Sequence, residues 1–534
     1  MKKAGFPLGI QLIVWLLTAL VISGVAAVLR ADEPPAYIDP DDELAQLRQR
    51  LRDAEQRIER MESRLARDNG LEQALATTAE NEPGAVRLTD LAVAPTPKDD
   101  ASELPSMLKD SLKSTDADVE QDAEFDERLQ FLEKSWKRFL VESAASKDAA
   151  EARPTVNWRA AVQTDSIWYG QSTQNRDAVG PAQDSADFRR LRIGMEGDLN
   201  KAIEYRIQVD FAYAGRPSVL DAWTGFRKLP YLGQVRFGHF LEPISLERYR
   251  FNQHLTFMER ALPVDTFVGG RRVGIDMRNR TKNERLTWQL GAFRTNDDNY
   301  GDDISSHAGW TGVVRMTGLP WYVEDTDDAY LLHLGGSYSY HASGNGTVRF
   351  QAAPEVSQIS GTGSVAPKFV DTGVMNANAF QLFGAEASLI YSSLSLQSEF
   401  FAAPVEQLSG PTPVFTGCYV YGSYFLTGEH RAYRKSTGVF ERMYPKTRAV
   451  KGPLDTDKTP KGMGAWEVAV RWSEVNLDSG NINGNRLNDI TCGVNWYLNA
   501  FFRIDFNYIH AMLQDAKLGF SDMDIYGVRF DLNY

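Results

Sequence analysis

The stretch that decides the fold is IEYRIQVDFAY, at residues 203–213. Apolar or aromatic residues occupy every second position from Ile203 to Tyr213, and Glu, Arg, Gln and Asp stand between most of them. Successive side chains of a β-strand point to opposite faces, so this period of two gives the strand one apolar and one polar face. The apolar face is about ten residues long, the length of a tilted strand that crosses a bilayer. The stretch therefore predicts one strand of an all-β, transmembrane antiparallel β-barrel, with its polar face towards the lumen.

The same alternation recurs along the chain from about residue 156. It returns at residues 190–196, 466–473 and 502–508, and turn-like segments such as 478–485 separate the strands. A soluble β-sandwich would bury its apolar face against a second sheet, and it does not account for Trp, Tyr and Phe along faces of this length. About 380 residues with this pattern make roughly 14 to 18 strands, and we expect 16.

The C-terminus carries a separate signal. Residues 526–534 alternate and end on Tyr534, so one face of the last strand is wholly apolar. This resembles the terminal strand by which bacterial outer-membrane proteins are recognised for insertion, with Tyr in place of the more usual Phe. Hydrophobic residues make up 43% and aromatic residues 11% of the chain. That composition is too polar for a bundle of membrane helices and is typical of a barrel with aromatic girdles.

The start of the chain predicts export. Lys2 and Lys3 precede an apolar run from Ile10 to Leu29, and small residues follow it. This pattern predicts a signal peptide at residues 1–31. The run is also long enough for an uncleaved membrane anchor, and in either case the rest of the chain leaves the cytoplasm.

An extension at residues 32–153 precedes the predicted barrel, which occupies 154–534. Residues 32–70 hold an acidic stretch and then, at 41–68, apolar residues spaced three and four apart. That spacing predicts either a short coiled coil or one solvated amphipathic helix. Residues 71–153 lack long-range periodicity and predict a disordered linker with one short amphipathic helix.

The acidic charge of the chain lies mostly in this extension. Residues 1–153 contain 20 basic and 30 acidic residues, and the remainder contains 38 and 41, out of 58 and 71 in all. The net charge is thus −10 before the predicted barrel and −3 within it. The overall charge of −13 therefore does not argue against the passage of anions.

A series of short motifs runs in order through the predicted barrel. The motifs are FRRLRIG at 188–194, GHFLEP at 238–243, LTFMERAL at 255–262, GRRVG at 270–274, LTGEHR at 426–431, GAWE at 464–467 and NWYLN at 495–499. This series resembles the phosphate-selective porins of the O and P type, over nearly all of residues 156–534. The resemblance implies a trimer of 16-stranded barrels, with narrow pores that are lined by Arg and Lys and favour phosphate or polyphosphate.

Seven arginines are the candidate anion-binding residues. Five of them fall on the polar face of predicted strands, and two lie in motif segments near turns or a constricting loop. They are Arg190, Arg192, Arg206, Arg236 and Arg272, and then Arg260 and Arg271. A guanidinium stays charged at any cellular pH and presents a planar fork of donors that matches phosphate oxygens.

The polar face carries carboxylates as well, which leaves a second interpretation open. Those carboxylates are Glu196, Glu204, Asp210, Glu467 and Asp505. Rows of paired arginines and carboxylates brace the wall of a barrel, and a nearly neutral lumen would select weakly between ions.

The sequence predicts no catalytic residues, no metal site, no cofactor and no nucleic-acid partner. The stretch His341 to Gly346 puts a His two residues from a Ser, but its Gly and Asn content predicts a plain loop. Neither His-Glu-x-x-His nor a Gly-rich phosphate loop occurs. Cys418 and Cys492 are too few for a disulfide framework.

We therefore expect an outer-membrane porin, surrounded by lipid, that passes small anions such as phosphate by diffusion. We expect a homotrimer whose extension lies in the periplasm, where residues 41–68 could contact the cell wall. Two alternatives stay open. One is a structural barrel tethered through that stalk, and the other is a general or sugar porin, in which lumen aromatics stack against the solute.

Overall fold

The computed structural model describes Lys134 and residues 154–212, 217–250, 252–295, 309–324, 329–356, 359–360, 363–364, 366–451 and 460–534. The predicted signal peptide and coiled coil, and the predicted linker apart from Lys134, lie outside the described residues. Within these ranges, no helix has both the length and the hydropathy needed to span a membrane.

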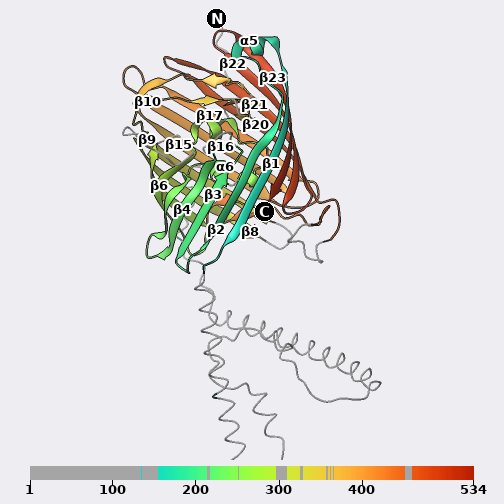
Figure 1. Ribbon diagram of the computed structural model, residues 1–534. Helices are drawn as coiled ribbons and strands as arrows, with labels where there is room; N and C mark the ends of the chain where they lie inside the picture. Colours follow the sequence, from blue (N-terminus) through green and yellow to red (C-terminus); the bar gives the residue numbers. More distant parts are fainter. Residues whose placement is uncertain are drawn as a thin grey trace, which may run out of the picture. The chain divides into compact units, whose positions relative to one another are not determined.

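Sixteen strands of the described chain form one closed antiparallel barrel, as the alternation predicts (Figure 1). In chain order they are β1 (Asn157–Gln171), β2 (Ser185–Asp198), β3 (Ile203–Asp210), β4 (Ser218–Leu229), β5 (Gly233–Leu241), β6 (Arg271–Arg280), β7 (Leu286–Thr295), β8 (Gly309–Glu324), β9 (Ala329–Ala342), β15 (Met375–Tyr391), β16 (Leu394–Gln407), β17 (Val414–Phe425), β20 (Ala465–Ser479), β21 (Ile482–Tyr497), β22 (Phe502–Asp515) and β23 (Gly519–Asn533). Each strand pairs with its neighbours in this order, and β23 returns to pair with β1. Closure leaves no unpaired edge, which a barrel in lipid requires.

The first and last strands, β1 and β23, pair along their length, from Ala161 and Asn533 to Gln171 and Met523. Beyond this ladder, the Ala160 N–H donates to the Tyr534 carbonyl at 3.1 Å, and the reverse bond measures 2.9 Å. The predicted last strand is therefore the one that closes the barrel.

The two faces of the wall differ as the period of two predicts. On β22, Phe506 and Tyr508 are exposed on the outer face, while Arg503, Asp505 and Asn507, at the alternate positions, are buried inside. Exposed tryptophans stand near both ends of β1, at positions 158 and 168. Such aromatic residues mark the two boundaries of an apolar band in membrane barrels.

One predicted turn is wrong in extent. The turn expected at 478–485 is a two-residue connection, because β20 continues to Ser479 and pairs there with Ile482 of β21. Gly480 adopts a φ of +60°, which a tight turn needs. The polar residues that suggested a longer turn belong to paired strands, so they indicate exposure to solvent and not reversal of the chain.

Four connections contribute further elements. The inner loop, residues 242–270, carries α6 (Leu246–Tyr249), the 3-10 helix η2 (Asn252–His254) and α7 (Leu262–Phe267). The β9–β15 connection carries β10 (Thr347–Val348), β11 (Gln351–Ala352), β12 (Ile359–Ser360), β13 (Gly363–Ser364) and β14 (Val370–Asp371), and α5 (Thr173–Val179) joins β1 to β2. The arm, residues 426–464 between β17 and β20, carries β18 (Tyr433–Arg434) and β19 (Val439–Phe440).

The apolar core lies inside the barrel, between the inner loop and one side of the wall. Phe257 and Phe267 of the inner loop pack with Phe350 of the β9–β15 connection and with Phe415 and Val475 of the wall. α6 lies against the inner face of the wall, because the N–H groups of Leu246 and Glu247 donate to Glu399 of β16. The loop thus fills much of the lumen beside this wall with apolar contacts, and a larger cavity remains on the side of β2–β6.

Candidate functional site: an arginine-lined lumen

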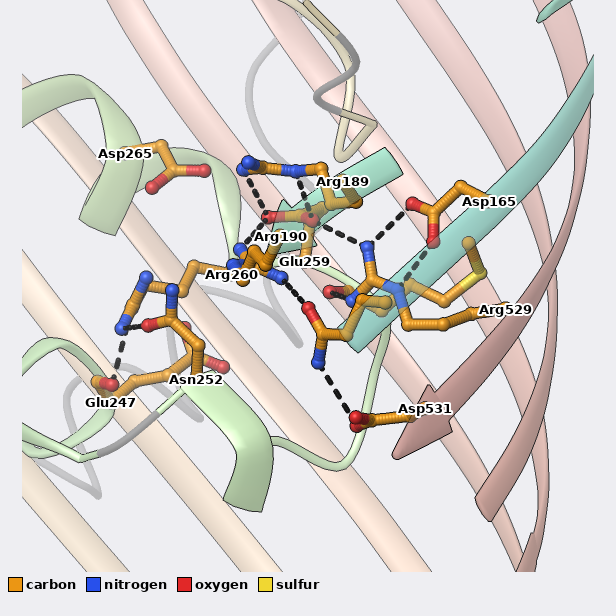
Figure 2. Close-up of polar contacts among 12 residues, drawn as sticks. Asp165, Arg189, Arg190, Glu247, Asn252, Glu259, Arg260, Asp265, Arg529 and Asp531 are labelled. Atoms are coloured by element: carbon orange, nitrogen blue, oxygen red, sulfur yellow. Dashed lines mark hydrogen bonds and ion pairs between the residues drawn. The ribbon is translucent and has the colours of Figure 1, made fainter. Parts of the chain in front are cut away.

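Glu259 of the inner loop is held by three arginines of the wall (Figure 2). It accepts hydrogen bonds from Arg189 at 2.9 Å and Arg190 at 3.0 Å, both on β2, and from Arg529 on β23 at 2.7 Å. Arg529 also donates to both oxygens of Asp165 on β1, at 2.7 and 2.6 Å. These ion pairs attach the inner loop to the wall where the barrel closes. With three guanidiniums and two carboxylates, the group keeps one excess positive charge.

Glu259 keeps its negative charge despite complete burial. Burial alone would raise the pKa of this carboxyl, but Arg189, Arg190 and Arg529 hold it well below its usual range. Charge-assisted hydrogen bonds to an ionised group are the strong ones in a protein. The attachment of the inner loop therefore persists at neutral pH.

Two more carboxylates fix the inner loop by capping its helices. Glu399 on β16 accepts the N–H groups of Leu246 and Glu247 at the start of α6, both at 2.9 Å. Glu355 of the β9–β15 connection accepts the N–H of Leu262 at the start of α7, at 3.2 Å, and binds Arg471 of β20 at 2.9 Å. The first N–H groups of a helix have no partner within it, so each carboxylate satisfies a group that would otherwise be left buried.

The seven predicted site residues all contact lumen or loop groups. Their partners are Gln163 and Glu259 for Arg190, Asp210 for Arg192, Glu196 for Arg206, Asp276 for Arg236, Asp221 for Arg271, Glu242 for Arg272, and the carbonyls of Glu247, Arg248 and Arg250 for Arg260. Six of them thus pair with carboxylates, and Arg260 holds the backbone of the inner loop. Their role in anion binding stays a prediction.

Sequence reasoning missed Arg189, which strict alternation places on the outer face. The register of β1 and β2 shifts by one residue, because Gln163 pairs with Arg190 while Thr164 pairs with Phe188. Arg189 is the extra residue of this bulge and reaches Glu259. A β-bulge redirects a side chain without changing the sequence pattern, so only the Arg-Arg doublet hinted at it.

Arg250 and Arg431 form the part of the site that the alternation could not find. Arg250 follows α6 in the inner loop and Arg431 lies in the arm, and their side chains are 6% and 3% exposed. Within the described part of the chain, neither guanidinium pairs with a carboxylate. Both lie over the ring of Phe440, at 5.8 and 3.9 Å from its centre. Arg431 donates to the Tyr421 hydroxyl at 2.7 Å, while its Nε and Nη2 and the Nε of Arg250 are buried without a partner.

This arrangement of like charges is unfavourable when nothing lies between them. Burial, and next the charge of Arg431, lowers the pKa of Arg250 to about 9. Both residues border a small cavity of about 40 Å³, which holds about three water molecules, since each needs roughly 10–15 Å³ by this measure. A buried donor without a partner costs about 1–3 kcal/mol, and an anion in the cavity would remove that cost. Arg431 belongs to the LTGEHR motif, and this motif is the one feature of the sequence that pointed to this pair of arginines.

A larger cavity of about 290 Å³ lies between β2–β6 and the arm. Six arginines and five carboxylates among the described residues line it, namely Arg206, Arg227, Arg236, Arg271, Arg278 and Arg434 with Glu196, Asp198, Glu204, Asp221 and Glu441. Rings of Trp223, Phe240 and Tyr249 complete the lining. Its charges are nearly balanced, whereas four arginines and two glutamates among the described residues line the smaller cavity.

His341 and Ser343, in the stretch predicted as a plain loop, have different hydrogen-bond partners. His341 belongs to β9, so the loop prediction is wrong at that residue, because the strand runs two residues further than the turn-forming Gly and Asn content suggests. Its ring accepts or donates to Ser339 at 2.8 Å and Thr311 at 2.9 Å, and Ser343 bonds to Thr347. No group of three His, Cys, Asp or Glu residues within the described ranges is placed to hold a metal ion.

Comparison with known proteins relates the whole barrel to one family. The model of the family described as phosphate-selective porin O and P matches residues 163–534. An uncharacterized protein of Caulobacter vibrioides is 25% identical over 330 residues, which are 60% of this chain and 62% of that protein. Porin O of Pseudomonas aeruginosa is 23% identical over 368 residues, 62% of this chain and 78% of its own. The match thus spans less than two thirds of the Caulobacter relative.

A solved structure is also similar. The anion-selective porin from Comamonas acidovorans superposes with a TM-score of 0.44 at 11% identity, and the match covers 72% of this chain and 100% of that one.

Proposed function

This chain belongs to the phosphate-selective porin O and P family, and on that premise we propose that it is an outer-membrane porin through which small anions, phosphate or polyphosphate in particular, diffuse passively. A porin family favours a channel over an enzyme. The observation that carries the anion preference is the pair of buried guanidiniums of Arg250 and Arg431, which lack carboxylate partners within the described residues. Arginine offers the planar donors that phosphate oxygens accept.

Conduction needs several weak sites in series, so that an ion can enter and still leave. The arginines predicted from the sequence would form the weaker sites along the path to the cavities. A passing anion can take the place of an arginine's carboxylate partner, and this exchange costs less free energy than leaving the arginine's charge unpaired. Arg250 and Arg431 would supply the most selective step. In the same proposal, residues 1–31 direct export and 32–153 lie in the periplasm, where 41–68 touch the cell wall or a partner.

Planar-bilayer recording of the full-length protein tests this function. In a salt gradient, we expect a reversal potential that shows anion preference, and a chloride current that inorganic phosphate blocks in a concentration-dependent manner. A large current without ion preference would reduce the protein to a general porin. An absence of current would favour the alternative of a tethered structural barrel.

We also propose a homotrimer, on the basis of the uneven height of the wall. β3, β4, β5, β6 and β7 contain 8, 12, 9, 10 and 10 described residues, whereas β8, β15 and β21 contain 16, 17 and 16. A strand that crosses the hydrocarbon core at a tilt needs about 9–11 residues. The low wall, defined as β3–β7, thus stays within about one residue of that length, whereas β8, β15 and β21 exceed it by about five or more. Contact with neighbouring subunits would cover the outer face of this lower side.

The proposal predicts that lipid contacts the outer face of the higher side of the wall and not that of the low wall. Ile275 on the low wall and Val470 on β20 are 51% and 55% exposed in the single chain. Each is replaced by Cys and labelled with bimane in a chain that also carries Cys418→Ser and Cys492→Ser. We expect brominated lipid to quench the label in Val470→Cys and to leave the label in Ile275→Cys largely unquenched. Equal quenching at the two positions would contradict the placement of the low wall at a subunit interface.

A further inference from the structure

The two lumen cavities adjoin each other. Glu441 of the arm lines both of them, and the consecutive residues Tyr249 and Arg250 line the larger and the smaller one respectively. A single small molecule could therefore place one end in each cavity. The chemistry of the two linings says what the ends would be.

The smaller cavity offers donors that lack acceptors. Arginines outnumber carboxylates in its lining, with Arg250, Arg431, Arg442 and Arg503 against Glu441 and Glu467, and Oε1 of Glu467 is buried without a hydrogen-bond partner. The Nε of Arg250 and the Nε and Nη2 of Arg431 are likewise buried without a hydrogen-bond partner. Both side chains are more than nine-tenths buried. Such donors suit the oxygens of a phosphate group, which accept several hydrogen bonds at once.

The larger cavity offers hydroxyl-recognising groups instead. Oε1 of Glu204 and the hydroxyl of Thr437 both line it, and both are buried without a hydrogen-bond partner in the described chain. Glu204 does form ion pairs, with Arg278 at 3.7 Å from Oε1 and with Arg227 at 3.2 Å from Oε2. A carboxylate oxygen can only accept, so Glu204 repels an anion but accepts a hydrogen bond from a hydroxyl group. A threonine hydroxyl can donate or accept. An inorganic anion alone would leave the Glu204 oxygen unsatisfied.

Size and apolar surface agree with a small organic body. At about 290 Å³, the larger cavity is at the lower end of the roughly 300–1,000 Å³ found for ligand sites. Trp223 lines it, and Gly238 makes room for the Trp223 backbone, since a Cβ at Gly238 would lie 2.7 Å from the Trp223 Cα. The cavity thus combines an indole ring with evenly mixed charges, which suit a neutral hydroxylated ring better than a second phosphate.

We propose that the preferred solute is a phosphorylated sugar, with its phosphate on Arg250 and Arg431 and its hydroxylated body in the larger cavity against Glu204 and Thr437. This proposal rests on the proposed function as an anion porin. It adds to that function a substrate class, an organic phosphate, and assigns a negatively charged residue to its recognition.

Block of the chloride current in planar bilayers tests the proposal, with glucose 6-phosphate and inorganic phosphate as the two probes. In the wild-type protein, we expect glucose 6-phosphate to block at a concentration about 10-fold lower, because one hydrogen bond to a charged group contributes about 1.5–3 kcal/mol. Glu204→Gln should act on the probes in opposite directions. It should weaken block by glucose 6-phosphate and strengthen block by inorganic phosphate, from which a repelling charge has been removed.

A matched control and a second variant complete the design. Glu284→Gln removes a carboxylate that pairs with Arg280 in an exposed turn, and it should leave both blocking concentrations unchanged. Thr437→Val removes the second hydroxyl partner without a change of charge, and it should weaken block by glucose 6-phosphate alone. Equal block by the two probes in the wild type would overturn the proposal while the anion porin stands. A current that neither probe blocks would instead refute the proposed anion function.

Discussion

Glu259→Gln is expected to lower the free energy of unfolding of the barrel by about 3–5 kcal/mol, the usual cost of removing one partner from a buried ion pair. The carboxylate neutralises Arg189, Arg190 and Arg529. A glutamine of the same shape leaves these guanidiniums with Asp165 as the one remaining carboxylate of the group. Urea-induced unfolding in detergent, followed by tryptophan fluorescence, measures the change.

Glu284→Gln is again the appropriate control. Its partner Arg280 is 49% exposed, and a surface pair contributes about 0–1 kcal/mol. If Glu259→Gln shifted the unfolding midpoint no more than Glu284→Gln, the inner loop would be held by its apolar contacts, and the interpretation of Glu259 as an anchor would fail.

The pH dependence of this attachment follows from the same contacts. The pKa of Glu259 lies well below its usual range in the folded protein, so its ionisation stabilises the fold fully at any pH above the ordinary glutamate pKa of about 4.3. That contribution is lost only as the pH falls through the lower, folded pKa. We therefore expect single-channel conductance to be steady from pH 8 to pH 5 and to change in stronger acid. Glu259→Gln should lack this acid step, since it has no carboxylate to protonate.

The double variant Arg250→Gln/Arg431→Gln is expected to weaken phosphate block of the chloride current by at least about 100-fold. Each charged hydrogen bond contributes about 1.5–3 kcal/mol, and the loss of two amounts to about 3 kcal/mol or more. Titration of inorganic phosphate against the current of single channels measures the effect. The protein should fold normally, because the variant removes two buried like charges that repel each other and replaces donors that lack a hydrogen-bond partner.

The control for this variant is Arg280→Gln, which removes an exposed arginine outside both cavities. It should leave the phosphate titration unchanged. A double variant that phosphate still blocks as in the wild type would move the selective step to the arginines predicted from the sequence. Arg190, Arg192 and Arg272 would then be the next substitutions.

Sequence and structure agree on features that depend on local alternation. The period of two in residues 203–213 correctly predicts which face of β3 points inward, and its recurrence predicts the 16 strands observed. Residues 526–534 correctly predict an apolar outer face on the strand that closes the barrel. These predictions hold because the backbone of a strand alone sets where each side chain points, whatever its distant neighbours are.

The sequence pattern could not predict contacts between segments that lie far apart in the chain. The bulge that turns Arg189 inward arises from the register between two strands, and the periodicity of one strand contains no information about it. Arg250 and Arg431 meet over Phe440 although 181 positions separate them in the sequence. Neither lies on a strand of the barrel, so no periodicity marks them.

By itself, then, the sequence determined the antiparallel barrel class, a range of roughly 14 to 18 strands that contains the observed 16, and the inward face of regular strands, since alternation follows from local backbone geometry. Only the tertiary structure decided which wall arginines pair with carboxylates, and that Arg250 and Arg431 of the inner loop and the arm lack such a partner among the described residues. The charge that an anion meets in the lumen depends on those pairs. They form when the inner loop and the arm pack against a wall whose strands lie far away in the chain.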